Sequence, residues 1–408
     1  MRWSIVPRML AGLVVCLCLV PLSAHESQVV ERISLRAARL FDGTSMHRNM
    51  VVEVADGRIV FVGARDGAVT HDLGDVTIMP GMIDVHTHID WHFGTDGRYG
   101  NRPDGPRETP EQRETAIAAN LRATLLAGFT TIQNLGNRGD GALRDAVAAG
   151  TLLGPRIVSS LGQLSPRDRT PDQLREAVRA SKAAGADVIK TFASGSIRDG
   201  GTLNVTQEQL DAICSEARAQ GLRAVVHAHD PDSIAAAVKA GCDQIEHGVF
   251  ADDRAIALMK DANVFFDPNI GLVLQNYVEN KAKFLGAGNY TDEGFAFMER
   301  AIPTLGPIFK KALDAGLRMP LGTDAVAGAH GQNAREAVAR VNAGQFPIGA
   351  LISATSLAAE SLGLKTSLGR LAPGYLADII AVSGDPSQDI AMLRSVTFVM
   401  AQGRVVSQ

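Results

Sequence analysis

Apolar and polar positions follow one repeating pattern through the middle of the chain. Amphipathic segments with helical spacing alternate with short apolar runs that are typical of buried strands. Several amphipathic segments end in Ala-Gly or Gln-Gly just before an apolar run, and glycine readily adopts the left-handed conformation that follows a helix. Helices are expected, for example, over residues 171–184, 206–220 and 232–240. The strand-like runs lie near residues 82–88, 129–135, 156–161, 187–193, 223–229, 244–248, 264–269 and 318–324.

This alternation predicts an α/β fold with a parallel sheet, because parallel strands need a crossover that is usually a helix. Eight repeats favour a closed (β/α)8 barrel of the TIM type. An open doubly wound sheet is the alternative, but no Gly-x-Gly-x-x-Gly motif follows the early strands. In such barrels the active site lies at the carboxyl ends of the strands, so that rim is where catalytic residues are expected.

Both ends of the chain have strand character. Residues 51–62 contain two apolar runs joined by Asp56-Gly57, a strong signal for a tight hairpin turn. Residues 378–382 and 396–400 near the C-terminus are apolar runs of the same kind. Neither end can hold a core alone, so we predict one small β-sandwich domain formed by both chain termini. The expected division is residues 25–80 and 366–408 for the sandwich and residues 81–365 for the barrel.

The first 24 residues have the layout of a secretory signal peptide. Arg2 and Arg8 precede an apolar run over residues 9–20, and Ala24 offers a small residue at a cleavage point. An uncleaved membrane anchor is the alternative, but this run is well short of the ~20 residues that a spanning helix needs. We therefore expect cleavage of residues 1–24, a periplasmic or secreted protein, and no stable membrane insertion afterwards.

Composition limits the partners that the protein can have. The chain of 408 residues is 46% hydrophobic, which is enough for a large core and two structural units. It carries 40 basic and 44 acidic residues, and loss of two arginines with the signal peptide changes the net charge from −4 to −6. This balance does not indicate binding to nucleic acid or to a membrane surface. We expect a small-molecule amide or dipeptide substrate, and a homo-oligomer is compatible with the sequence.

Two cysteines, Cys214 and Cys242, remain after the predicted signal peptide. Cys214 lies in an amphipathic segment, and Cys242 follows the helix-ending Gly241. Buried free thiols are the expected state, although one disulfide is permitted outside the cytoplasm.

Candidate catalytic residues gather at the ends of the strand-like runs. His86 and His88 form a His-Thr-His pair, and residues two apart in a strand project from the same face. Such a pair is common by chance, but four further runs also end in a histidine, a lysine or an aspartate. Because the carboxyl ends of the strands meet at one rim of the barrel, these side chains are expected to lie together. The six candidate metal ligands are His86, His88, Lys190, His227, His247 and Asp324.

Imidazole and carboxylate ligands are typical of Zn²⁺ sites. Lys190 is the exception, because an ammonium group buried beside cations is unfavourable. Carbamylation by CO₂ would convert it into a carboxylate that bridges two metals, so we predict two Zn²⁺ ions per chain. A hydroxide between the ions would attack the substrate, and Asp324 would carry its proton to the leaving amine. The expected ligands are His86, His88 and Asp324 on the first ion, His227 and His247 on the second, and carbamylated Lys190 on both.

Three further residues are candidates for contact with the substrate. His229 shares the strand face of His227, so either could bind metal; we assign the metal to His227 and a substrate-facing, catalytic role to His229. Arg198, in the loop over residues 194–201, could bind a substrate carboxylate, although an exposed arginine without a ligand fits the sequence at least as well. His330 either touches the substrate or is a solvated loop residue.

With their neighbours, these residues resemble the amidohydrolase superfamily. Its first-strand signature is similar to Pro-Gly-Met-Ile-Asp-Val-His-Thr-His at residues 80–88. The chain is most similar to the imidazolonepropionase-like branch, which includes bacterial Xaa-Pro dipeptidases and ochratoxin-hydrolysing amidases. The resemblance covers nearly everything after residue 33 and implies a metal-dependent hydrolase. Further segments that resemble the superfamily are residues 189–195, 226–229, 245–248, 322–325 and 369–378.

Two segments depart from the pattern of this branch. Relatives often carry a Gly-Gly-His-Gly type loop after the third strand, whereas residues 161–168 contain no histidine. The second strand usually ends in Arg-Asp and here ends in Gln133-Asn134. Both changes alter the rim of the pocket and leave the metal ligands intact, so the specificity of any one relative does not transfer directly.

The leading hypothesis is a secreted metal-dependent amidohydrolase that cleaves a C–N amide bond in a dipeptide or an N-acyl amino acid. The alternative enzyme is a mononuclear cyclic-amide hydrolase or deaminase of the imidazolonepropionase type, but such relatives usually lack a lysine at the position of Lys190. A noncatalytic barrel ranks last, because all six candidate ligands are present. Hydrolysis of lactones or phosphoesters stays open, since the same type of metal centre serves those bonds.

Overall fold

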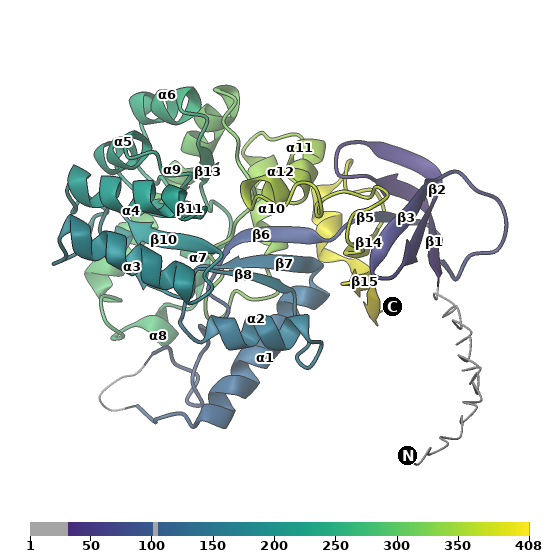
Figure 1. Cartoon of the computed structure of the whole chain (residues 1–408), viewed down its shortest axis with the longest axis horizontal. Coiled ribbons are helices and arrows are strands. Elements are labelled where there is room, and N and C mark those ends of the chain that lie inside the picture. The colour runs from purple at the N-terminus through teal and green to yellow at the C-terminus, as the bar shows by residue number, and fades with distance from the viewer. Residues whose placement is uncertain (1–31, 101–104, 408) are drawn as a thin grey trace, which may run out of the picture. The chain divides into compact units, whose positions relative to one another are not determined.

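A computed structural model of the chain describes residues 32–100 and 105–407, and the signal peptide predicted at residues 1–24 lies outside this part. The described residues form a small β domain from both chain ends and a ring of parallel strands surrounded by helices (Figure 1). Within these ranges, no helix is long and apolar enough to cross a membrane.

The β domain is one mixed sheet to which both chain ends contribute. β1 pairs with β2 and β5, and β5 in turn pairs with β14, so the C-terminal strands continue the N-terminal ones (Figure 1). The predicted β domain from both termini is confirmed, and hydrogen bonds join all its strands into a single sheet. The strands are β1 (Ile33–Phe41), β2 (Met46–Ala55), β3 (Arg58–Gly63), β4 (His71–Asp72), β5 (Val76–Pro80), β14 (Ile379–Ser383), β15 (Val396–Ala401) and β16 (Arg404–Ser407).

The predicted hairpin forms between β2 and β3. Asp56 and Gly57 have φ angles of 50° and 71°, the pair of left-handed residues that a two-residue turn between twisted strands requires. Gln402 and Gly403 repeat this geometry between β15 and β16, with φ angles of 52° and 76°.

The barrel strands are parallel, as the alternation of helices and strands predicts. They form a three-stranded group, β6-β7-β8, and a five-stranded group, β9-β10-β11-β12-β13. The amide of Asp187, just before β10, donates to the carbonyl of Ser159 in β8 at 2.8 Å and joins the two groups. The strands are β6 (Met82–Thr87), β7 (Phe129–Asn134), β8 (Arg156–Ser159), β9 (Gln163–Leu164), β10 (Val188–Phe192), β11 (Arg223–Ala228), β12 (Gln244–His247) and β13 (Phe265–Asp267).

The last predicted strand, residues 318–324, does not form a regular strand. We call residues 318–325 the closing segment, because it lies between β13 and β6 and touches each through an isolated bridge. Pro320 has no amide hydrogen, and two other amides of the segment bond to side chains: Gly322 donates to Asp267 at 2.9 Å and Thr323 to Asp84 at 3.0 Å. The segment also has backbone hydrogen bonds with both neighbouring strands: the Asp324 amide donates to the carbonyl of His86 at 2.7 Å, and the Phe266 amide donates to that of Arg318 at 3.0 Å. Backbone and side-chain bonds therefore close the barrel together.

Helices cover the outside of the strands, and their ends follow the sequence signals. Thr170 and Thr206 cap α3 and α4 by accepting hydrogen bonds from amides in the first turn. Gly185 and Gly221, which follow these helices, have φ angles of 88° and 68°, as the Ala-Gly and Gln-Gly joints predict. The helices are α1 (Pro110–Leu126), α2 (Asp140–Ala148), α3 (Pro171–Ala183), α4 (Gln207–Ala219), α5 (Pro231–Lys239), α6 (Asp253–Asp261), α7 (Val273–Glu279), α8 (Lys281–Phe284), α9 (Asp292–Asp314), α10 (Ala334–Asn342), α11 (Pro347–Ser353) and α12 (Ser356–Ser361), with short 3₁₀ turns η1 (Ile197–Asp199) and η2 (Ile390–Arg394).

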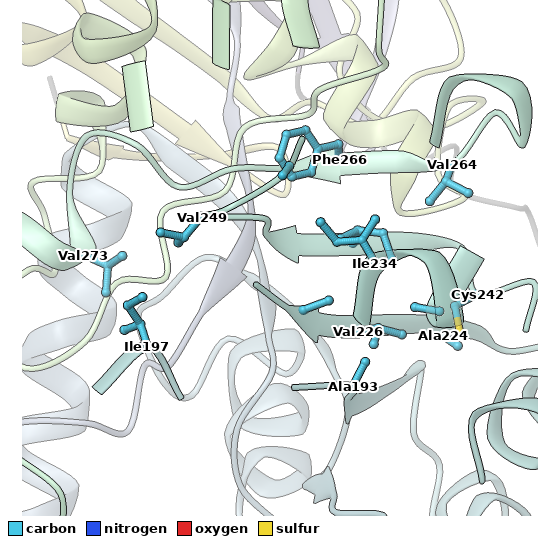
Figure 2. Packing of buried hydrophobic residues seen from close by; sticks show 14 of the residues in the cluster. Ala193, Ile197, Ala224, Val226, Ile234, Cys242, Val249, Val264, Phe266 and Val273 are labelled. Carbon is cyan, nitrogen blue, oxygen red and sulfur yellow. The ribbon is translucent and has the colours of Figure 1, made fainter. Parts of the chain in front are cut away.

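The largest hydrophobic cluster fills the space between the five-stranded group and its helices. Figure 2 shows Ala224 and Val226 of β11 beside Ile234 of α5, with Phe266 of β13 in the same packed layer. These side chains are all fully buried, which makes this part of the barrel a rigid support for the residues at its strand ends.

Cys214 and Cys242 form a disulfide, so the expectation of free thiols was wrong. Cys214 lies on α4 and Cys242 directly precedes β12, and their Cα atoms are 5.2 Å apart. The two residues are 28 positions apart in sequence but meet because α4 packs beside α5 in the ring of helices. This lateral packing is a tertiary feature that the sequence pattern does not contain.

Candidate metal centre

The strand ends bring all six predicted metal ligands to one cavity of about 200 Å³. Each ligand comes from the carboxyl end of a barrel strand or from the closing segment, as the barrel fold requires. His229 and Arg198 also line this cavity. The six residues are His86, His88, Lys190, His227, His247 and Asp324.

Asp324 lies at the centre of the cluster. Its Oδ1 atom is 3.1 Å from Nε2 of His88 and 3.4 Å from Nε2 of His86. Nε2 of His86 is also 3.4 Å from Nζ of Lys190. The potential ligand atoms of His86, His247 and Asp324 all lie within 4.8 Å of one another, which is a separation that one ion could span.

The chemistry of these side chains fits a divalent metal. Burial, together with the Lys190 charge, lowers the pKa of His86 well below its usual value, and burial likewise lowers the pKa values of His227 and His247. Neutral imidazole is the form that binds metal. Burial would raise the pKa of Asp324, but His86 and His88 lower it below its usual value, which keeps the carboxylate ionised.

A left-handed backbone conformation orients two of the candidate ligands. His247 and Asp324 have φ angles of 71° and 51°, in the left-handed region that residues other than glycine seldom occupy. Each such residue costs about 1–3 kcal/mol, and residues of this kind cluster at functional sites. At the end of β12 this turn lets Glu246 and His247, which are adjacent in sequence, both approach His86.

Glu246 is a residue that the sequence analysis missed. Its Oε2 atom is 2.6 Å from Nδ1 of His86, and both side chains are almost fully buried. Burial raises the pKa of Glu246 to about 7. A carboxylate on the far nitrogen of a histidine fixes which nitrogen carries the hydrogen and leaves the other free for metal. No local sequence signal could have identified Glu246, because its partner His86 lies 160 positions earlier in the chain.

His227 and His229 lie side by side, and both rings contact His247, with centroids 4.7 and 5.1 Å away. Nε2 of His227 donates to the carbonyl of Gly195 at 3.1 Å, which leaves Nδ1 for another partner. Neither ring nitrogen of His229 has a hydrogen-bond partner among the described residues. Burial and, to a smaller extent, the charge of Arg198 lower the pKa of His229 to about 3.

Arg198 is half-buried in the cavity wall, not exposed. Its guanidinium carbon lies 4.1 Å from the centre of the Tyr290 ring and 5.6 Å from that of Tyr277, and its Nε atom donates to Asn289 at 2.8 Å. Burial opposes its charge, but Tyr290 and Tyr277 raise its pKa above the usual value. The cation is thus held in place at the cavity wall.

His330 is not among the residues that line the cavity. Its Nε2 atom is 3.0 Å from the carbonyl oxygen of Trp91, and the Trp91 ring stacks on His88 with centroids 4.7 Å apart. The sequence analysis did not identify Trp91 or Tyr277 as wall residues, because both belong to segments outside the strands. Gln163 occupies the wall in the region where relatives carry a loop histidine.

Gln133 and Asn134, where the branch usually has Arg-Asp, have structural contacts. Gln133 donates to the carbonyl of Val85 at 2.7 Å and accepts from Arg223 at 2.5 Å. Asn134 donates to Asp140 at 2.7 Å. Neither residue lines the cavity, so this departure concerns the barrel interior.

Comparison with known proteins places these features in a family. A model of the amidohydrolase family matches residues 77–406. Ochratoxinase of Aspergillus niger is 28% identical over 411 aligned residues, which cover 88% of this chain and 83% of that protein. Imidazolonepropionase of Ralstonia nicotianae is 26% identical over 392 residues, which cover 86% of this chain and 90% of that protein.

Solved structures with a similar fold include proteins of the same kind as the sequence relatives. A Xaa-Pro dipeptidase with methionine bound in its active site has a TM-score of 0.82 and 28% identity, and the match covers 93% of this chain and 100% of that one. The A. niger ochratoxinase structure has a TM-score of 0.78 and 25% identity, over 93% of this chain and 96% of that one. Because the family match spans every strand of the barrel, the protein belongs to the amidohydrolase family and is a hydrolase that acts on carbon–nitrogen bonds.

Proposed function

We propose that the protein is a secreted, metal-dependent amidohydrolase that cleaves the amide bond of a dipeptide or an N-acyl amino acid. The observation that carries this proposal is one cavity lined by the six candidate metal ligands and by the cationic Arg198. The name of one structural relative, Xaa-Pro dipeptidase, supports an amide whose amine half is an amino acid.

Two Zn²⁺ ions are the proposed cofactor. Metal ions in such a site supply Lewis acidity toward the substrate carbonyl and acidify water. Lys190 would join the two sets of ligands as its carbamate, because it is 2% exposed and an unmodified ammonium there would oppose the binding of cations. The first set would be His86, His88 and Asp324, and the second His227 and His247.

The hydrogen bonds of two histidines support this assignment. A ligand histidine commonly donates its remaining N–H to a carboxylate or a backbone carbonyl. His86 has Glu246 on its Nδ1 atom, and His227 has the Gly195 carbonyl on its Nε2 atom. His227 is therefore the proposed ligand on β11, while His229 faces the substrate.

Asp324 is the proposed general acid–base residue. Its ionised carboxylate can accept a proton when water attacks and can deliver that proton to the leaving amine. Arg198 would bind the carboxylate of the substrate, and its contacts with Tyr277 and Tyr290 fix the guanidinium before binding. The apolar wall residues Ile197, Val273 and Leu274 would contact the side chain of the substrate.

Location outside the cytoplasm is part of the proposal. The layout of residues 1–24 supports export, and the Cys214–Cys242 disulfide is compatible with an oxidising compartment. N-terminal sequencing of protein exported by its own host should find a start near residue 25, whereas a retained Met1 would exclude cleavage.

The second candidate is a mononuclear cyclic-amide hydrolase, which the match to imidazolonepropionase favours. The two candidates differ in metal content, with two ions per chain for the first and one for the second. Hydrolysis by the zinc-loaded protein should be measured on dipeptides, N-acyl amino acids, cyclic amides and lactones, together with zinc content. Turnover of cyclic amides alone, with one ion bound, would reject the leading candidate.

A further inference from the structure

A cluster of buried charges lies directly behind the candidate metal centre. Arg340 of α10 donates through Nη2 to Asp267 at 3.1 Å and through Nε to Glu336 at 2.8 Å. All three side chains are 0% exposed. Such clusters can often be replaced by apolar residues without loss of stability, so stability alone does not explain this one.

The cluster reaches the closing segment, which carries Asp324. Nη1 of Arg340 donates to the carbonyls of Met319 and Pro320 at 3.1 and 2.9 Å. Asp267 accepts from the amide of Gly322, and a Cβ on Gly322 would lie only 2.0 Å from that carboxylate. Glycine is therefore required where the segment approaches Asp267. These bonds add to the irregular backbone hydrogen bonds that hold the segment just before Asp324.

The same cluster reaches His86 from the other side. The Oδ2 atom of Asp267 is 3.9 Å from Nδ1 of His86, and the nearest carboxyl oxygens of Asp267 and Glu246 are within 4.8 Å of each other. Glu246 in turn holds Nδ1 of His86. Arg340 thus fixes Asp267, which lies against both the closing segment and the His86–Glu246 pair.

Arginine is the residue that this geometry requires. Four hydrogen bonds from three nitrogens of one planar group connect helix α10, β13 and the closing segment. A lysine would keep the charge but could not reproduce this fork of donors.

From these contacts we infer that Arg340 is a positioning residue of the metal centre: it sets the places of Asp324 and His86 through the closing segment and Asp267, without touching metal or substrate. The inference rests on the metal site of the proposed function. It differs from a purely structural role because it predicts a change in metal affinity that exceeds the change in stability of the metal-free protein.

The test compares Arg340→Lys with Arg335→Lys. Arg335 lies on the same helix and also binds a glutamate, Glu279, but it is partly exposed and does not line the cavity of the metal centre, so its variant is a matched control. For each metal-free protein, the Zn²⁺ dissociation constant is measured by competition with a chelator, and Tm is measured with and without Zn²⁺. The absorption spectrum of the Co²⁺-loaded protein reports the geometry of the ligands independently of activity.

Arg340→Lys should weaken Zn²⁺ binding about 10- to 100-fold, the range for partners of metal ligands, and should change the Co²⁺ spectrum. The Tm of the metal-free form should fall by less than the Tm of the Zn²⁺-loaded form, and Arg335→Lys should match wild type. A lower Tm in the metal-free form with unchanged Zn²⁺ affinity and spectrum would overturn the inference. Absence of Zn²⁺ binding by wild type would instead reject the proposed function.

A second variant keeps the test valid if Arg340→Lys does not fold. The triple variant Arg340→Met, Asp267→Asn, Glu336→Gln removes all three charges of the cluster. Its carboxamide oxygens can still accept from the Gly322 amide and from one of the Ile270 and Gly271 amides, so one of these three backbone donors loses its acceptor. It should fold and should bind Zn²⁺ about 10- to 100-fold more weakly than wild type. Wild-type affinity in this neutral cluster would overturn the inference.

Discussion

The barrel places its candidate ligands by different means on its two sides. On one side, Lys190, His227 and His247 stand at or near the ends of β10, β11 and β12, where backbone ladders fix the register of each strand. On the other side, Asp324 belongs to the closing segment, where Pro320 has no amide hydrogen and two amides bond to side chains. The first side is held by continuous backbone ladders, and the second by irregular backbone hydrogen bonds to which particular side chains add.

Because of this difference, substitutions on the two sides should affect stability and activity differently. A ladder depends little on the identity of one polar side chain, so substitution of a ligand there should leave the fold intact. The closing segment is held in part by Asp84, Asp267 and Arg340, so substitutions of residues that are not ligands should still move Asp324. Variants on the two sides should therefore differ in how loss of activity relates to loss of stability.

The largest effect on activity is expected on the ladder side, from Lys190→Ala. Loss of the proposed bridge should reduce bound zinc below two ions and reduce kcat by more than the ~100-fold that is typical of residues behind a ligand. The far-ultraviolet circular dichroism should match wild type, because β10 keeps its backbone pairing. Zinc content, kcat and the spectrum are the measurements.

Chemical rescue makes this prediction specific. A short carboxylic acid with added zinc should restore part of the activity of Lys190→Ala, because it supplies the missing carboxylate. Lys182→Ala, in the last turn of α3, is the control and should behave as wild type. Two tightly bound ions and near-normal turnover in Lys190→Ala would exclude the bridge and favour a mononuclear centre.

On the other side, Asp84→Asn should disturb both stability and activity. The two oxygens of Asp84 accept from the amides of His86 and Thr323, from the Thr323 hydroxyl at 2.6 Å and from Asn333 at 2.7 Å. An asparagine amide would oppose some of these donors, and each buried donor left unpaired costs about 1–3 kcal/mol. Hydrogen exchange should increase over residues 318–325, and kcat should fall about 10-fold or more.

The control for Asp84→Asn is Asp72→Asn, which removes a carboxylate from an exposed ion pair with Arg36. An exposed pair contributes about 0–1 kcal/mol, so exchange over the closing segment and turnover should not change. Equal exchange in both variants would mean that Asp84 does not hold the segment.

A smaller and more selective effect is expected from Arg198→Ala. Arg198 lies in the η1 turn, outside both the strand ladders and the closing segment that hold the candidate ligands. Loss of a charged hydrogen bond, worth about 1.5–3 kcal/mol, should raise KM for anionic substrates about 10- to 100-fold and leave neutral analogues unaffected. Arg300→Ala, which removes an exposed arginine over the Phe297 ring, is the control. Equal effects on anionic and neutral substrates would remove the carboxylate role.

The two sides also differed in how far the sequence predicted them. Apolar runs that end in His227 or His247 are local patterns, and barrel geometry alone brings strand ends to one rim. The fold and the convergence of the six candidate ligands on one cavity could therefore be predicted without contacts. The closing segment was expected as a strand because residues 317–321 are mostly apolar, but Pro320 and the carboxylate of Asp267 replace regular pairing there.

Residues that act through long-range contacts left no local signal. Glu246 is meaningful only because His86 lies 2.6 Å away, 160 positions earlier in the chain. Arg340 looks like an ordinary helix residue until the packing of α10 against β13 and the closing segment is known. Trp91 and Tyr277 reach the cavity from segments whose course is set by tertiary packing.

The smallest effect on activity is expected from removal of the disulfide, which lies at the amino end of β12, opposite the rim that carries His247. Cys214 and Cys242 are 28 positions apart, and a crosslink of this span contributes about 3.5 kcal/mol by restricting the unfolded chain. Cys214→Ala/Cys242→Ala should therefore lower Tm while kcat and zinc content at 25 °C stay within about twofold of wild type, since the ladders of β11 and β12 still fix the strand ends. Reduction of the wild-type protein should lower Tm to the same value and should not affect the double variant. Loss of zinc in the double variant at a temperature where it remains folded would show that the ladder side also depends on particular side chains, and would remove the contrast between the two sides.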